Sequence, residues 1–154
     1  MHRGTGEKTM IELEPIGVIH SPFTGRGSAP RQGRSCSEPM KIEIYPQFVP
    51  GLGTMEGISH IWVLYWMDRA ERDILFAKRP DWDEPRPVFT IRSPARPNPI
   101  ALSIGRIEAI EEIEKGIITV TGLEALDGSP VLDIKPYVVE IDCIFDSLNP
   151  FEKK

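Results

Sequence analysis

Apolar residues along this chain fall into short runs separated by turn-forming residues, a pattern typical of a β-rich protein. The run over 60–67 is continuously apolar or aromatic, so we expect a strand buried on both faces, although a helix would also fit. Residues 68–78 would suit a short helix. The other runs that predict strands cover 11–20, 40–45, 88–92, 101–110, 117–123, 131–134 and 138–145.

The segments between these runs contain turn and loop residues. Residues 24–39 predict a long loop because they hold several glycines and prolines, and the charged, proline-containing stretch 79–87 predicts another. Residues 111–116 suit the connection of a hairpin, and residues 50–53 and the pair 127–128 predict turns. Short strands at regular intervals with few helices favour an antiparallel sheet or barrel.

Two glycine-containing stretches argue against a dinucleotide-binding fold of alternating strands and helices. The glycines at 51, 53 and 57 miss the G-x-G-x-x-G spacing and precede a strand-like run rather than a helix. The Gly25 to Gly27 pair is followed by Pro30. Neither stretch predicts a Rossmann fold.

The composition predicts one soluble, cytoplasmic domain. The chain has 154 residues, 15 prolines and a formal charge of −5, so it carries no global basic footprint for RNA. No apolar run approaches the ~20 residues of a membrane span, and no signal-peptide core is present. The two cysteines and three histidines are scattered, so we expect no metal site and reduced thiols, although one disulfide is possible. We expect a flexible lead-in over 1–10, the domain over 11–146 and a tail over 147–154.

The segment 88–103 carries the most distinctive chemistry. Three prolines within six residues, at 94, 97 and 99, prevent a helix and stiffen the backbone. Arg92 and Arg96 lie four residues apart, so an extended chain would present both guanidinium groups on one face. Such a pair suits a carboxylate or phosphate ligand. The alternative is a proline-rich surface loop with solvated arginines.

The same segment resembles the central motif of a known family. Arg92-Ser93-Pro94-x-Arg96-Pro97-Asn98-Pro99-Ile100 is similar to that of the TsaA-like family, also called TrmO. Four further segments match that family in order: 16–23, 29–33, 57–64 and 126–137. Members of this family are S-adenosylmethionine-dependent methyltransferases acting on threonylcarbamoyladenosine in tRNA. Five motifs in order are specific where one would be weak.

The resemblance implies a mainly β fold: a single-sheet β-barrel with a few short marginal helices, not a Rossmann fold. It also implies S-adenosyl-L-methionine as the cofactor, a homodimer, and a tRNA anticodon loop as the partner. The apolar excess of residues 61–67 is consistent with a subunit interface. Many bacterial members continue into an extra C-terminal domain beyond the length of this sequence, which leaves the RNA substrate open.

Matching positions for the cofactor site come from several loops. Arg34 would hold the cofactor carboxylate, Asp68 or Glu124 would accept bonds from ribose hydroxyls, and the backbone of 123–126 would read the adenine edge. Each position could instead be an ordinary turn or surface contact. The full set that the resemblance implies is Gln32, Gly33, Arg34, Met67, Asp68, Arg92, Leu102, Leu123, Glu124, Ala125 and Leu126.

Substrate and catalytic residues are less constrained. We expect Arg96 to bind the carboxylate of the substrate, with Asn98, Lys135 and Tyr137 as further substrate contacts. Methyl transfer from a sulfonium needs positioning and no protein nucleophile, and a base would accept the proton that the nitrogen loses. The candidates for that base are His60 and Asp133.

Each of these two candidates has a structural alternative. His60 could be a core histidine bonded to backbone, and Asp133 could form an ion pair with Lys135 that fixes the end of a strand. Asp127 is most simply a turn residue. Two other functions stay open at this point: a cofactor-binding sensor or adaptor without catalysis, and a methyltransferase acting on a small molecule, which the acidic charge favours.

Overall fold

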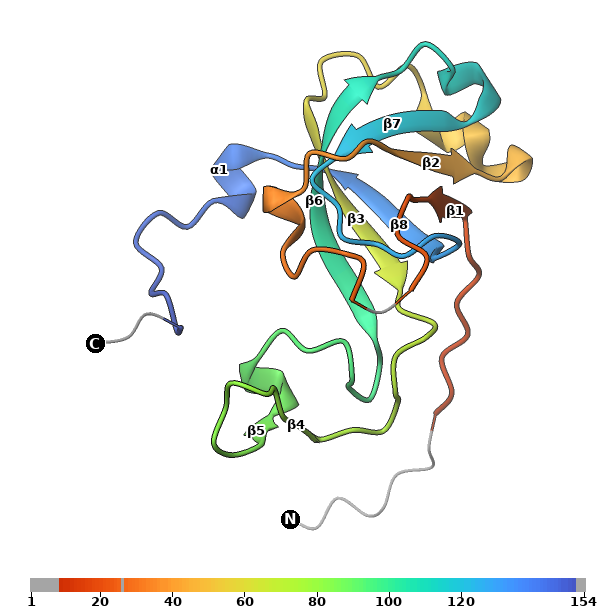
Figure 1. The fold of residues 1–154 in the computed structure, drawn as a ribbon. Helices are drawn as coiled ribbons and strands as arrows, with labels where there is room; N and C mark the ends of the chain where they lie inside the picture. The colour runs from red at the N-terminus through yellow and green to blue at the C-terminus, as the bar shows by residue number, and fades with distance from the viewer. Residues whose placement is uncertain (1–8, 26, 152–154) are drawn as a thin grey trace.

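A closed six-stranded antiparallel β-barrel forms the body of the molecule (Figure 1). The computed structural model describes residues 9–25 and 27–151. Around the barrel the strands follow the order β1-β2-β7-β6-β3-β8, and β8 pairs back onto β1. The strands are β1 (Gly17–His20), β2 (Met40–Ile44), β3 (His60–Trp66), β6 (Ile100–Ala109), β7 (Ile117–Thr121) and β8 (Pro130–Pro136).

Alternation along the strands fills the barrel. In β3 the buried positions are Ile61, Val63 and Tyr65, and the residues between them are half-buried. This strand is therefore buried on one face, not on both as its apolar run predicts, because its outward residues meet partial cover rather than a second layer. The interior is completed by inward residues of the other strands, among them Ile19, Met40, Ile42, Ile118, Val120 and Val131.

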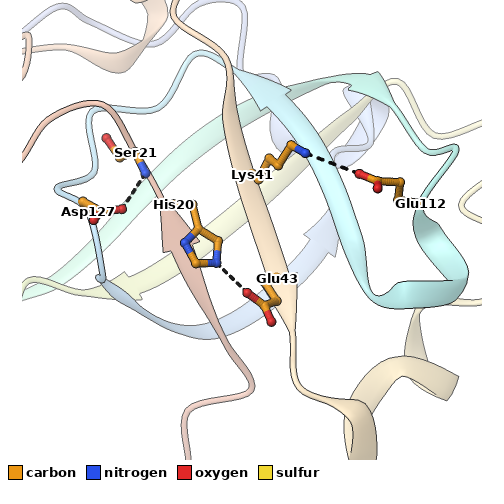
Figure 2. Close-up of polar contacts among 6 residues, drawn as sticks. All are labelled: His20, Ser21, Lys41, Glu43, Glu112 and Asp127. Carbon is orange, nitrogen blue, oxygen red and sulfur yellow. Dashed lines mark hydrogen bonds and ion pairs between the residues drawn. The ribbon is translucent and has the colours of Figure 1, made fainter.

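Polar outward side chains of β1 and β2 form ion pairs on the surface of the barrel, one between the two strands and one with the loop before η4 (Figure 2). His20 Nε2 lies 2.5 Å from a carboxylate oxygen of Glu43, and Lys41 Nζ lies 3.4 Å from one of Glu112. Exposed pairs of this kind contribute little to stability because both ions stay hydrated. The strand register is therefore set by the apolar inward face.

A short hairpin and several short helices lie around the barrel. A two-stranded hairpin, β4 (Phe76–Ala77) with β5 (Arg86–Pro87), lies outside it. The helices are the 3₁₀ turns η1 (Gly33–Ser35), η2 (Pro46–Leu52), η3 (Val88–Thr90) and η4 (Ile113–Lys115), and the α-helix α1 (Val139–Asp142). The single-sheet barrel with short marginal helices confirms the fold class expected from the sequence.

Several predicted elements were wrong at the edges of the fold. Residues 11–16 do not join β1, and 11–15 lie exposed. The helix expected over 68–78 is absent because Asp73 adopts a left-handed backbone, with φ of 60°, that no α-helix accommodates. The turn expected at 50–53 is instead the end of η2. Part of the N-terminal lead-in, residues 1–8, and residues 152–154 of the tail lie outside the described residues.

Two predicted strands contain a short helix instead, and a local side-chain hydrogen bond supports each helix. At 88–92 the hydroxyl of Thr90 donates to the carbonyl of Pro87 at 2.7 Å, which closes η3. At 138–145 a carboxylate oxygen of Asp142 accepts the Val138 N–H at 2.8 Å and starts α1. Local side-chain bonds of this kind compete with strand pairing.

None of the helices among the described residues has the length and apolar character needed to cross a membrane.

Strand β1 depends on a glycine at its first position. A Cβ on Gly17 would collide with the backbone carbonyl oxygen of Glu43 on β2, and a backbone atom inside a ladder cannot move aside cheaply. We predict that Gly17→Ala lowers the free energy of unfolding by about 1–3 kcal/mol. Gly51→Ala is the matched control, because open space surrounds Gly51 and its φ is not positive. Urea unfolding of both variants measures this, and equal stabilities would contradict it.

Candidate functional site

A pocket of about 870 Å³ opens where β3 ends and β6 begins. Its walls come from five parts of the chain: the loop 27–32 before η1, the end of β3 with the following turn, Arg79 between β4 and β5, the segment 92–102, and the loop after β7. Such a volume lies in the range of about 300–1,000 Å³ that is usual for small-molecule sites. Segments far apart in the sequence therefore build one concave site.

A buried carboxyl group lies at the base of this pocket. Glu124 Oε1 accepts a hydrogen bond from the hydroxyl of Ser103 at 3.0 Å, whereas its Oε2 is buried without any partner among the described residues. Burial raises the pKa of Glu124, and the Ser103 bond, the nearby backbone N–H groups of Glu124 and Gly33 and the positive charge of Arg92 oppose that rise. Burial and the nearby Glu124 also raise the pKa of Tyr65, which lines the same pocket.

Gly33 explains how this carboxyl can be buried. A Cβ at position 33 would collide with Glu124 Oε2 and with the carbonyl oxygen of Gly122. The buried backbone of η1 therefore packs directly against the loop after β7. The bond from the Gly122 N–H to the Cys36 carbonyl, at 3.1 Å, joins the same two segments.

Ser21 and Asp127 hold the loop after β7 from its other side. The Ser21 hydroxyl donates to the Ala125 carbonyl at 2.7 Å, and its N–H donates to Asp127 Oδ1 at 2.9 Å (Figure 2). Arg69, from the turn after β3, donates to the Asp127 carbonyl at 2.7 Å. The Asp-Gly pair forms the expected turn, with Gly128 at a φ of 81°. These bonds fix the pocket wall made by residues 124–126.

The two arginines of the proline segment both line the pocket, although their backbone bends rather than runs extended. Arg92 Nη2 donates to the Leu102 carbonyl at 3.3 Å. Arg96 Nη1 donates to the carbonyls of Ser93 at 2.9 Å and Ile91 at 3.3 Å. The Arg96 side chain therefore holds its own loop in a bend. This bend brings the Arg92 and Arg96 side chains to the same pocket.

The structure brings together most of the residues expected at the site. Those lining the pocket are Gln32, Met67, Asp68, Arg92, Leu102, Glu124, Ala125 and Leu126 from the expected cofactor set, and Arg96 and Asn98 from the expected substrate set. Gly33 lies directly behind Glu124, and Leu123 is fully buried in the core. Both support the pocket from behind without lining it.

Other expected residues lie elsewhere. Arg34, His60 and Tyr137 line a second groove outside the barrel, together with Arg106 and Glu108. His60 Nδ1 lies 2.9 Å from the Ser59 hydroxyl rather than from a backbone group, and Tyr137 packs against Trp62 with ring centroids 5.7 Å apart.

The two remaining residues of the expected set pair with each other. Asp133 accepts from Lys135 at 2.8 Å, the ion pair that was the alternative for these two residues. Neither residue lines the pocket or the second groove.

Two residues of this pocket, Ser103 and Tyr65, were not expected there from the sequence. The signal for Ser103 was available, because a hydroxyl residue at an inward position between Ala101 and Gly105 of β6 breaks the apolar alternation. On β3 the inward side chains of Ile61 and Val63 are apolar, whereas that of Tyr65 carries a hydroxyl group. Because β3 pairs with β6, Tyr65 and Ser103 together predict polar groups inside the barrel wall.

The donor set of the pocket fits a ligand that is part nucleoside and part amino acid. Met67, Leu102 and Leu126 offer apolar surface for a base, Gln32 and Arg92 offer donors for a carboxylate, and the unpartnered oxygen of Glu124 lacks a hydrogen-bond donor. Within the described residues, no group of three His, Cys, Asp or Glu side chains is arranged to hold a metal ion.

The chain is similar in sequence to proteins named as tRNA methyltransferases or as S-adenosyl-L-methionine-binding proteins. Residues 18–143 match the family model described as tRNA-methyltransferase O N-terminal domain. An S-adenosyl-L-methionine-binding protein of Archaeoglobus fulgidus is 50% identical over 132 residues, which cover 86% of this chain and 93% of the relative. The human tRNA (adenine(37)-N6)-methyltransferase is 32% identical over 148 residues, which cover 89% of this chain and 32% of that enzyme.

A solved structure shows the same fold. The crystal structure of TrmO from Pseudomonas aeruginosa superposes with a TM-score of 0.76 at 32% identity, covering 94% of this chain and 64% of that one. This chain therefore spans nearly all of the archaeal relative, less than two thirds of the bacterial protein and about a third of the human enzyme.

The raised pKa of Glu124 predicts a pH-dependent stability. The folded protein holds this proton more tightly than the unfolded chain, so the Glu124 contribution is present at low pH and is lost as pH rises from the ordinary value of 4.5 through the raised folded pKa. Glu124→Gln should therefore gain stability relative to the original protein as pH increases. Denaturant unfolding of both proteins across this range tests it, with Glu108→Gln as an exposed control. A stability difference that does not change with pH would refute the assignment.

Proposed function

Because the chain belongs to the family of tRNA-methyltransferase O N-terminal domains, we propose that it is an S-adenosylmethionine-dependent methyltransferase. Its proposed target is the N6 nitrogen of threonylcarbamoyladenosine beside the anticodon of a tRNA in the cytoplasm. The observation that carries this is one pocket that combines Glu124, with its unpartnered carboxyl oxygen, and two arginines, Arg92 and Arg96. A relative named for S-adenosyl-L-methionine binding supports the proposed cofactor, and a relative named for tRNA adenine methylation supports the proposed target.

The lining residues match the parts of the cofactor. Arg92 and Gln32 bind its carboxylate, and the Glu124 carboxyl accepts from an ammonium or ribose hydroxyl, which would supply its missing partner. Asp68 offers a second acceptor, and Leu102 adds apolar surface for the adenine. Arg34, expected for the carboxylate, lies in the second groove and has no part in this assignment.

The bound cofactor would supply an activated methyl group. The protein has to hold the accepting nitrogen in line with it and exclude water, which is where most of the rate enhancement of such a transfer arises. The bonds from Ser21 and Arg69 keep the wall at 124–126 in place for this purpose. His60 and Asp133 do not line the pocket, so no step is assigned to them.

Arg96 is the substrate-recognising residue in this proposal. The modified base lies in a single-stranded loop and can turn out into the pocket without melting a duplex. Its threonyl group ends in a carboxylate, and Arg96 is a cation of the pocket that no carboxylate of the described chain neutralises.

We also propose that the protein is a homodimer. Apolar side chains of α1 and the following segment lie open to solvent, with Ile141 75%, Phe145 99% and Leu148 92% exposed. Exposed apolar rows of this kind mark interaction sites, and a two-fold self-association is the commonest solution. Light scattering at micromolar concentration should give twice the mass of 17.3 kDa. A monomer at every accessible concentration would exclude it.

The decisive experiment combines cofactor binding with methyl transfer. Calorimetry should show saturable binding of S-adenosylmethionine, and labelled methyl groups should appear in tRNA in a single turnover. Arg92→Ala should weaken cofactor binding about tenfold or more, because a charge-assisted bond is lost. Arg106→Ala, in the second groove, should not. Binding without transfer would indicate a sensor, and transfer only to a small molecule would exclude the RNA substrate.

Substrate recognition is tested on tRNA with and without the threonylcarbamoyl group. Arg96→Ala should lower kcat/KM for the modified tRNA about ten- to a hundredfold, or about 1.5–3 kcal/mol. Arg96→Lys keeps the charge and controls for disturbance of the loop that Arg96 curls. The assignment fails if the original enzyme methylates both tRNAs equally, or if Arg96→Ala discriminates as well as the original enzyme.

A further inference from the structure

Residues 68–99 form an arm that leaves the barrel between β3 and β6 and carries the β4–β5 hairpin (Figure 1). The arm supplies much of one side of the pocket, including Asp68, Arg79, Arg92 and Arg96. A target base that turns into this pocket belongs to a strand, so its neighbouring nucleotides must lie at the rim. The following inference rests on the proposed function and concerns where those neighbours bind.

A stacked arginine–tryptophan unit lies on this arm. The Arg79 guanidinium lies 5.0 Å from the ring centroid of Trp82, and the Arg86 guanidinium lies 4.3 Å from the same ring. Stacking on an indole holds a guanidinium flat and limits its rotation. Arg79 also lines the pocket, so this oriented cation belongs to its rim.

Most of the arginines that line the pocket form no ion pair with a carboxylate of the described residues. Five arginines line the pocket, and of these only Arg69 forms an ion pair with a carboxylate among the described residues, with Asp68 at 3.4 Å. The other four are Arg31, Arg79, Arg92 and Arg96. A chain with a net charge of −5 can bind a polyanion only through such a local excess.

The arm also exposes aromatic side chains. Phe76 is 62% exposed and Phe89 is 76% exposed. Aromatic rings and arginine planes together are the surfaces on which unpaired bases stack. A protein partner would be expected to bring carboxylates or a continuous apolar face, whereas the same arm carries Arg79, Arg92 and Arg96, which form no ion pair among the described residues. The combination favours a single-stranded nucleic acid.

We propose that the arm is the RNA-docking surface of this protein, with Arg79, held by Trp82, as the contact for the nucleotide next to the target base. The acidic residues Asp81, Asp83 and Glu84 lie in the loop between β4 and β5, and among the described residues they form no ion pair with the rim arginines. They would border the docking surface and disfavour RNA beyond the hairpin loop.

The test measures RNA affinity without catalysis. Fluorescence anisotropy follows a labelled anticodon stem-loop RNA on protein saturated with S-adenosylhomocysteine, at several salt concentrations. Arg79→Ala should weaken binding about five- to tenfold, and should lower the slope of log affinity against log salt by about 0.7–0.9. Trp82→Leu keeps every charge, so it should weaken binding and leave the slope unchanged. Arg106→Ala, an exposed arginine of the second groove, is the matched control and should bind as the original protein does.

The outcomes separate this proposal from the proposed function. If Arg79→Ala binds RNA normally while the original enzyme still methylates tRNA, the arm is not the docking surface and the function stands. If Arg79→Ala loses affinity but no methylation occurs, the arm is supported and the catalytic proposal fails. An equal loss in Arg106→Ala, or a change of oligomeric mass in the arm variants, would overturn the docking proposal in favour of a diffuse contact or a subunit interface.

Discussion

The contact between the Gly33 backbone and the Glu124 carboxyl is the constraint on which the pocket depends. Without a side chain at position 33, η1 packs directly onto the loop after β7 and buries one carboxyl oxygen without a partner. A buried, unpartnered acceptor costs free energy that the barrel has to supply. Strain of this kind persists where the surroundings enforce it, and it leaves the group ready for a ligand donor.

Segments far apart in the sequence hold the loop after β7, and with it Glu124, in place. Ser21 follows β1, Arg69 follows β3, and both bond to the loop after β7 that carries Glu124. Glu124 thus stands on a rigid base, whereas the arm that carries Arg92 and Arg96 lies outside the barrel. In the proposed function the arm contacts both the cofactor, through Arg92, and the substrate, through Arg96, which suits a reaction that only has to align two bound partners.

The barrel strands could be predicted because β2, β3, β6 and β7 each fall in a short apolar run between turn-forming residues. The run at 88–92 could not be assigned correctly, since local bonds such as that from Thr90 to Pro87 favour a helical turn there. At the site, most of the expected lining residues followed from the family resemblance. The inward hydroxyl of Ser103 could have been noticed in the sequence, but its bond to Glu124 depends on how the loop after β7 meets β6. Arg34 lines the second groove because η1 turns it away from the pocket. Sequence pattern predicts faces of elements, whereas a pocket depends on how those faces meet.

A crystal structure of the protein with S-adenosylhomocysteine tests the central claim most directly. We expect the ligand in the pocket between Arg92 and Glu124, with its base against Met67, Leu102 or Leu126 and a hydrogen-bond donor next to the unpartnered carboxyl oxygen of Glu124. Ligand in the second groove with Arg34, His60 and Tyr137, leaving Glu124 without a partner, would contradict it.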